Sequence, residues 1–88
     1  MTRLLRVANT LGLHARPAAQ FVKTAARFSC DIFVSKGREK VNGKSVLGLL
    51  MLGAGPGSEL TVYAQGADAP QALAELALLA ERRFGEAA

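Results

Sequence analysis

The chain has 88 residues, half of them apolar and a fifth charged, and its formal net charge at pH 7 is +4. This balance is typical of one small globular domain over residues 1–88 and excludes a disordered chain. No apolar run approaches the roughly 20 residues of a membrane span, and the first residues lack a signal-peptide layout. One cysteine, Cys30, and one histidine, His14, cannot supply an intramolecular disulfide or a metal site. We therefore expect a cytoplasmic monomer without metal, cofactor or membrane contact.

The first predicted element is a strand over Arg3–Ala8, in which Leu5 and Val7 face the same side. A helix over Ala15–Arg27 follows, because apolar residues then recur at helical spacing. Asn9, Thr10 and Gly12 favour irregular backbone between these two elements, so the only histidine lies where a loop ends and a helix begins.

His14 is thus expected at or near the N-cap of that helix, close to free backbone N–H groups and the positive end of the helix dipole. Pro17 suits a first helical turn because the N–H it lacks would have no partner there. The guanidinium of Arg16 can bind phosphate oxygens with two hydrogen bonds. An imidazole beside an anion-binding helix start is what a transient phosphohistidine needs, although a lone histidine at a helix start is more often a cap or a surface residue.

Two short strands come next, over Asp31–Ser35 and Lys40–Val41, joined by a turn at Lys36-Gly37. The following segment, Gly43-Lys44-Ser45, does not fit a nucleotide-binding P-loop, because five residues instead of four separate it from the preceding glycine, Gly37. Ser45 is instead predicted to be a helix N-cap that also offers a modification site.

The helix after Ser45, Val46–Leu52, is apolar on nearly all sides. A single short helix on a one-sided sheet cannot bury every face, so some of its residues should remain exposed and form a protein-docking patch. The pattern alone does not decide which of its residues are exposed, and the alternative is a wholly buried helix.

A loop rich in glycine leads to a strand over Glu59–Ala64, and the chain ends with a helix. Asp68 is predicted to cap this helix together with Gln71, and Pro70 fits its first turn. Its buried stripe reaches Phe84, and Gly85 is expected to end it.

The resulting order, β-α-β-β-α-β-α, predicts an α+β fold: an open-faced β-sandwich with one sheet and the helices on a single face.

Three segments of the chain resemble the HPr family, the histidine-containing phosphocarrier proteins of the bacterial phosphoenolpyruvate-dependent phosphotransferase system. They are Gly12-Leu13-His14-Ala15-Arg16-Pro17-Ala18, Val41-Asn42-Gly43-Lys44-Ser45-Val46-Leu47-Gly48 and Gly57-Ser58-Glu59-Leu60-Thr61-Val62. The resemblance covers essentially the whole chain and implies a four-stranded antiparallel sheet with three helices on one side.

The resemblance also implies roles for individual residues. His14 would accept a phosphoryl group on Nδ1 from phosphorylated enzyme I and pass it to a IIA-type acceptor protein, as a co-substrate more than a stand-alone enzyme. Arg16 and the backbone N–H groups of Ala15 and Arg16 would stabilise the phosphate. Ser45 would be phosphorylated by an HPr kinase/phosphorylase, which weakens transfer through the histidine. The apolar residues next to this serine, Val46, Leu47 and Leu50, would form the docking surface for partner proteins.

The runs Leu49-Leu50-Met51-Leu52-Gly53-Ala54 and Arg82-Arg83-Phe84-Gly85 resemble family members from bacteria with reduced or nitrogen-related phosphotransferase systems. The sugar-transport and regulatory branches both stay open. The main alternative function is a regulatory protein that acts through Ser45 phosphorylation and partner binding. A small-molecule site would need more converging polar groups than His14 and Arg16. We expect no nucleic-acid partner, because the basic residues are spread along the chain without interleaved aromatics.

Overall fold

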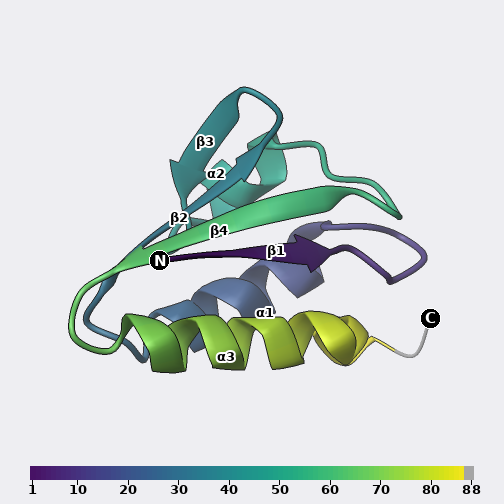
Figure 1. The fold of residues 1–88 in the computed structure, drawn as a ribbon. Helices are drawn as coiled ribbons and strands as arrows, with labels where there is room; N and C mark the ends of the chain where they lie inside the picture. The colour runs from purple at the N-terminus through teal and green to yellow at the C-terminus, as the bar shows by residue number, and fades with distance from the viewer. Residues whose placement is uncertain (87–88) are drawn as a thin grey trace.

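The computed structural model describes residues 1–86, and Figure 1 shows the arrangement of their elements. In chain order these are β1 (Thr2–Arg6), α1 (Ala15–Ala25), β2 (Asp31–Lys36), β3 (Glu39–Asn42), α2 (Val46–Met51), β4 (Glu59–Gln65) and α3 (Ala69–Glu81), followed by a 3₁₀ turn (Arg83–Gly85). Every predicted strand and helix is present, and apart from the end of the last helix the differences at the ends are small. Within residues 1–86, no helix is long and apolar enough to span a bilayer.

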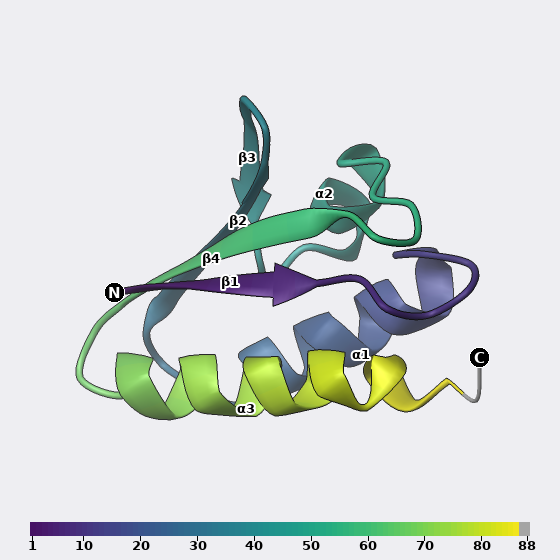
Figure 2. The same ribbon diagram turned by 45° about the vertical axis from the view of Figure 1, so that its right-hand side comes forward.

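The four strands form one antiparallel sheet in the order β1-β4-β2-β3. Helices α1 and α3 lie side by side beneath the sheet, and α2 packs against α1 and β3 (Figures 1 and 2). The predicted open-faced β-sandwich is therefore confirmed.

The core lies between the sheet and the helices. Alternate strand residues supply its upper half, as period-two patterning predicts: Leu5, Ile32, Val34, Leu60, Val62 and Ala64 are all buried. The apolar stripes of the helices supply the lower half, with Phe21 of α1 and Leu76 of α3 fully enclosed. Val7 is also buried, although β1 ends at Arg6, because its N–H and C=O pair with Ser58 and Gly57.

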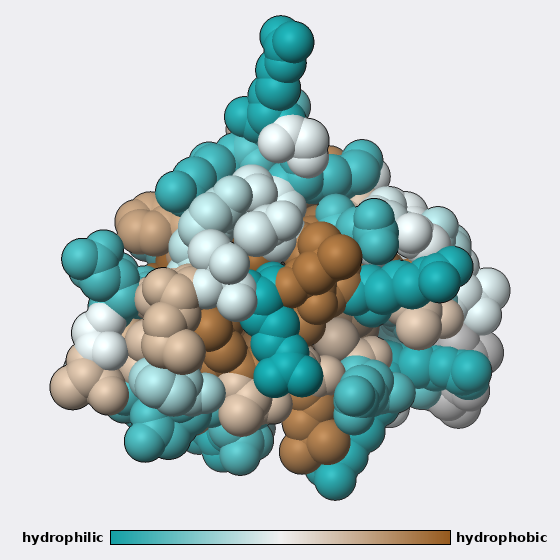
Figure 3. Space-filling view, in the orientation of Figure 1, coloured by the Kyte–Doolittle hydropathy of each residue, from teal (hydrophilic) through white to brown (hydrophobic). Residues whose placement is uncertain are grey.

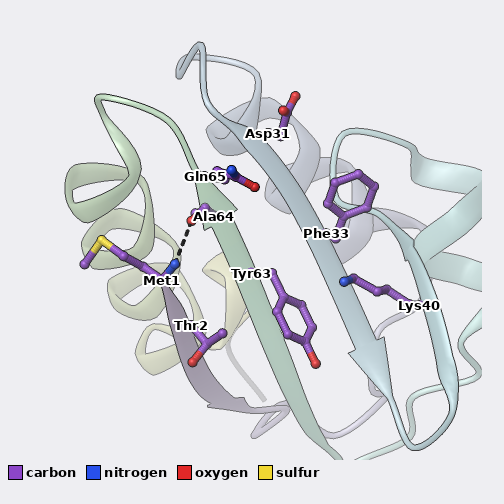
Figure 4. Close-up of a pocket in the computed structure, with 8 residues that line it drawn as sticks. All are labelled: Met1, Thr2, Asp31, Phe33, Lys40, Tyr63, Ala64 and Gln65. Carbon is purple, nitrogen blue, oxygen red and sulfur yellow. Dashed lines mark hydrogen bonds between the residues drawn. The ribbon is translucent and has the colours of Figure 1, made fainter.

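No helix within residues 1–86 covers the opposite face of the sheet. Its side chains include Phe33, Lys40 and Tyr63, which line a shallow pocket of about 270 Å³ (Figure 4). The Lys40 ammonium lies 4.1 Å from the centre of the Tyr63 ring, a cation–π contact. On the side of the molecule that faces the reader in Figure 1, hydrophobic side chains form separate patches between hydrophilic ones (Figure 3).

The prediction for the end of the last helix was wrong. Helix α3 stops at Glu81, and Arg83 and Phe84 each have a left-handed φ of 55°. A bulky residue rarely adopts this conformation. Here it turns the Phe84 ring into the core, where 1% of the residue is exposed. The helix therefore ends early because burial of the Phe84 ring in the core requires a backbone conformation that is not helical.

The predicted capping pair at the start of α3 was also wrong. Asp68 occupies the N-cap position, but its side chain makes no capping bond. Its carboxylate instead accepts hydrogen bonds from the backbone N–H groups of Ser29 and Cys30, at 2.8 and 2.9 Å. Asp68 thus ties α3 to the segment between α1 and β2.

Candidate functional site

His14 is the N-cap residue of α1, as predicted. Its backbone is extended, with φ −83° and ψ −170°, and its carbonyl accepts the first helical hydrogen bond from Ala18, at 3.0 Å. Its side chain makes no capping bond and is 36% exposed. The imidazole is therefore free for other interactions and remains open to solvent.

The start of α1 presents unpaired donors next to the imidazole. The backbone N–H groups of Ala15 and Arg16 have no acceptor within residues 1–86, and Pro17 carries no N–H. Pro17 is itself buried and fixes the first turn. Two amide N–H groups and the positive end of the helix dipole thus point toward the space beside His14.

The loop before His14 is held against the loop that follows α2. The N–H of Leu13 donates to the carbonyl of Ala54 at 2.8 Å. Gly12 has a left-handed φ of 73°, and a Cβ at this position would lie 2.6 Å from the same carbonyl oxygen. Only glycine fits here without displacing the neighbouring backbone.

A carboxylate from the far end of the chain binds the imidazole. Nε2 of His14 lies 3.1 and 3.0 Å from the two side-chain oxygens of Glu86. Asn9 donates from Nδ2 to the same carboxylate at 2.8 Å. In Figures 1 and 2 the segment after α3 lies below the loop between β1 and α1.

The surroundings of Glu86 decide its charge. Burial raises the pKa of its carboxyl, but hydrogen bonds with His14 and Asn9 lower it, as do the charges of His14 and Arg16. The net result is a pKa below the ordinary value of 4.5, so Glu86 is ionised at neutral pH. Arg16 is exposed and forms no ion pair with any residue in the range 1–86, so it acts here only through its charge.

An ionised carboxylate can only accept hydrogen bonds, so the imidazole nitrogen that contacts it must carry the proton. The neutral ring of His14 therefore has its hydrogen on Nε2 and a lone pair on Nδ1. Nδ1 has no hydrogen-bond partner among the described residues. His14 thus offers a nucleophilic nitrogen at a helix start where two backbone amides are unpaired.

Ser45 is the N-cap of α2, and its hydroxyl accepts a hydrogen bond from the N–H of Gly48 at 3.0 Å. Gly43 packs directly on β2: a Cβ there would lie 2.6 Å from a side-chain carbon of Ile32. The Gly43-Lys44-Ser45 segment thus has a packing and capping role, and it does not form a phosphate-binding loop.

Helix α2 is partly exposed, as predicted. Leu49 is fully buried, whereas Leu47 and Leu50 are 69% and 37% exposed. Val46, the third predicted docking residue, is half-buried against the core. Met51, which the prediction omitted, is 68% exposed one helical turn beyond Leu47.

A second exposed leucine, Leu11, lies 71% exposed in the loop before His14. Leu11, His14 and Leu50 line one shallow depression of about 310 Å³. Exposed apolar side chains therefore come both from the loop before His14 and from helix α2. We call Leu11, Leu47, Leu50 and Met51 the docking patch.

Sequence reasoning missed Asn9 and Glu86 as parts of the site. Asn9 was interpreted as a loop former, and Glu86 lies 72 residues from the histidine it contacts. Within residues 1–86, no three His, Cys, Asp or Glu side chains gather in a way that could hold a metal ion. The polar groups around His14 suit an anion.

Comparison with known proteins supports this interpretation. The family model described as "PTS HPr component phosphorylation site" matches residues 1–82. The phosphocarrier protein HPr of Neisseria meningitidis serogroup A is 40% identical over 82 residues, which cover 93% of this chain and 92% of the relative.

Two solved structures share the fold. HPr-C-His from Thermoanaerobacter tengcongensis has a TM-score of 0.95 and 42% identity, covering 100% of this chain and 99% of that one. Crh of Bacillus subtilis, titled a catabolite repression protein with a swapped dimer, has a TM-score of 0.76 and 44% identity. The two chains are covered to 90% and 91%. From its sequence, its fold and these relatives, the chain belongs to the HPr family of phosphocarrier proteins of the phosphotransferase system.

Proposed function

We propose that this chain carries a phosphoryl group on Nδ1 of His14, which it receives from phosphorylated enzyme I and delivers to a IIA-type acceptor protein. The observation that carries the proposal is the contact between Nε2 and Glu86, which leaves Nδ1 with its lone pair in the residue that caps the helix start.

The transfer needs no further group from this chain. The lone pair of Nδ1 forms a bond to phosphorus, and the bond between phosphorus and the donor's histidine nitrogen breaks with its electron pair returning to the donor. The N–H groups of Ala15 and Arg16 and the Arg16 guanidinium stabilise charge on the phosphoryl oxygens. Pro17 contributes no donor at this point, so the phosphate is held without a third amide and can be passed on.

The docking patch explains how a partner would find the site. Two of its side chains, Leu11 and Leu50, line the same depression as the imidazole, and exposed apolar side chains beside a reactive group are typical of a surface that binds another protein. The net charge of +4 favours encounter with acidic partners.

We further propose that Ser45 is a regulatory phosphorylation site, the substrate of an HPr kinase/phosphorylase. Its hydroxyl sits one residue before the α2 helix that carries Leu47, Leu50 and Met51. A phosphate there would add nearly two negative charges beside the docking patch and weaken the binding of an acidic partner. The likeness to Crh, which is described as a catabolite repression protein, favours a regulatory role alongside phosphoryl transfer.

A labelling assay tests the carrier function. Enzyme I and radiolabelled phosphoenolpyruvate are mixed with the wild-type chain, with His14→Ala and with Ser45→Ala. We expect label that is labile to acid and stable to alkali on the wild type and on Ser45→Ala, and none on His14→Ala. An unlabelled wild type in the presence of charged enzyme I would contradict the proposal. Gel filtration of the same samples tests whether the chain is a monomer.

A further inference from the structure

Asn9 is the one fully buried polar side chain within residues 1–86. Its Nδ2 donates two hydrogen bonds, to the carbonyl of Gly12 at 2.6 Å and to Glu86 at 2.8 Å. Its Oδ1 is buried and has no partner in the described part of the chain. A buried acceptor without a partner costs free energy, so the two hydrogen bonds of Nδ2 must offset this cost and hold the side chain in place.

The two acceptors fix the orientation of the amide. If the amide were turned over, Oδ1 would face the Gly12 carbonyl and the Glu86 carboxylate, and three acceptors would meet without a hydrogen. Asn9 therefore connects the loop that ends at His14 with the carboxylate that binds His14. Both contacts are made by one NH₂ group, which no hydroxyl or aliphatic side chain can imitate.

The chain after α3 is shaped to bring Glu86 to this amide. Arg83 and Phe84 adopt left-handed backbone, and the buried Phe84 ring anchors the turn. Glu86 then arrives with its side chain only 13% exposed, between Asn9 and the imidazole. The carboxylate is thus held from both sides.

We propose that Asn9 and Glu86 act together as positioning residues for His14: the Asn9 amide holds the Glu86 carboxylate on Nε2 and keeps that nitrogen protonated throughout the phosphoryl cycle. This inference rests on the proposed function and extends it to the phosphorylated state.

The proton on Nε2 matters most when the phosphoryl group leaves. With phosphate on Nδ1 and hydrogen on Nε2, the ring is an imidazolium. When the bond between Nδ1 and phosphorus breaks, its electron pair stays on Nδ1 and the ring becomes neutral imidazole, so no proton has to move. Without the Nε2 proton, the leaving group would be an imidazolate, which is far less stable. A carboxylate on Nε2 favours the protonated form.

The other surroundings of the ring do not replace this carboxylate. Arg16, whose charge acts on Glu86, is a cation and so cannot take the place of the carboxylate on Nε2. The depression beside the imidazole is otherwise lined by uncharged residues, among them Leu11, Leu13 and Leu50. Glu86 is therefore the anionic group that contacts the ring.

The test follows hydrolysis of the phosphohistidine as a function of pH. The chain is phosphorylated with enzyme I and phosphoenolpyruvate and separated from them, and loss of phosphate is measured from pH 4 to 9. Wild type is compared with Asn9→Ala and Glu86→Gln, with Glu75→Gln as the matched control. Glu75 is an exposed carboxylate on α3 that pairs with Arg27 at 3.4 Å.

We expect the pH midpoint between fast and slow hydrolysis to fall by about one unit in Glu86→Gln. It should fall in the same direction in Asn9→Ala and stay unchanged in Glu75→Gln. Glu86→Gln alters no backbone contact and keeps the test valid if Asn9→Ala folds poorly. Midpoints equal to wild type in Glu86→Gln would overturn the proposal.

A second readout separates this proposal from the carrier function. If enzyme I does not phosphorylate the wild type, the carrier function fails, and ¹⁵N NMR of the unphosphorylated His14 ring at alkaline pH decides the role of the pair. We expect hydrogen on Nε2 alone in wild type and a mixture of both tautomers in Asn9→Ala and Glu86→Gln. The same ring shifts in all three proteins would overturn the pairing.

Discussion

Replacement of Gly12 by alanine tests how the loop before His14 is held. Gly12 has φ 73°, and an added Cβ would meet the Ala54 carbonyl oxygen at 2.6 Å and the Gly55 Cα at 2.9 Å. These neighbours are backbone atoms, so they cannot move aside as a flexible side chain can. The loop itself must shift, and it carries the hydrogen bond between Leu13 and Ala54.

Gly53→Ala is the matched control for this change. Gly53 is also left-handed, with φ 60°, but an added Cβ would meet nothing within 4 Å. Alanine in left-handed backbone costs about 1 kcal/mol. Overpacking against fixed backbone adds about 1–3 kcal/mol. We therefore expect Gly12→Ala to lose about 2–4 kcal/mol of unfolding free energy and Gly53→Ala about 1 kcal/mol.

Urea denaturation followed by circular dichroism measures both losses. With a slope of about 1 kcal/mol per M for a protein of this size, the midpoint should fall by about 2–4 M in Gly12→Ala and about 1 M in Gly53→Ala. Equal losses of unfolding free energy in the two variants would show that the Ala54 carbonyl does not restrict the side chain at position 12, and would refute the close packing of this loop.

Three further predictions concern the fold and the docking patch. The backbone N–H of Ser29 holds the pKa of Asp68 below its ordinary value of 3.8, despite an opposing effect of burial. A carboxyl whose pKa is lowered by folding stabilises the fold at pH values above its unfolded pKa, and this stabilisation is lost as the pH falls. In urea titrations, wild type should therefore lose more unfolding free energy than Asp68→Asn between pH 5 and pH 2. Equal losses in the two proteins would contradict this. Phe84→Ala should lower the unfolding free energy by about 3–5 kcal/mol, because the ring is buried, and a loss below 1 kcal/mol would mean that the ring does not anchor the turn. Leu47→Asp should slow phosphoryl transfer from enzyme I at least tenfold with little change in stability, whereas Leu78→Asp, at an exposed leucine on α3, should not; the same rate in both variants would remove Leu47 from the docking patch.

Local patterns predicted most of the fold. The alternation of apolar residues in β2 and β4 gave the buried faces correctly, because Ile32, Val34 and Val62 must all face the helices in one register. Ser45 was correctly predicted as the cap of α2, since a serine directly before an apolar run satisfies an amide that the helix leaves free.

The errors arose where distant segments compete for a side chain. Asp68 has the right residue type and position for a cap, but two backbone N–H groups from Ser29 and Cys30 bind its carboxylate instead. Phe84 continues the apolar stripe of α3, yet its ring is buried only because the helix ends before it. Neither competitor lies within the sequence window from which caps and stripes are inferred.

The candidate site divides in the same way. His14, Arg16 and Pro17 stand together in the sequence, so their shared place at a helix start could be predicted from local patterns. Asn9 and Glu86 could not, because their contact joins residues 77 positions apart. Asparagine in a loop and glutamate near a chain end are both usually solvated, and only the fold shows that Asn9 binds the carboxylate that contacts the imidazole.

The most direct test of the account is NMR of the phosphorylated chain, with ¹⁵N in the His14 ring and phosphate supplied by enzyme I. The account predicts that phosphorus is coupled to Nδ1 and that Nε2 carries the hydrogen, bound to Glu86. Phosphorus coupled to Nε2, or to no nitrogen of His14, would contradict it, because the carboxylate would then not determine which nitrogen reacts.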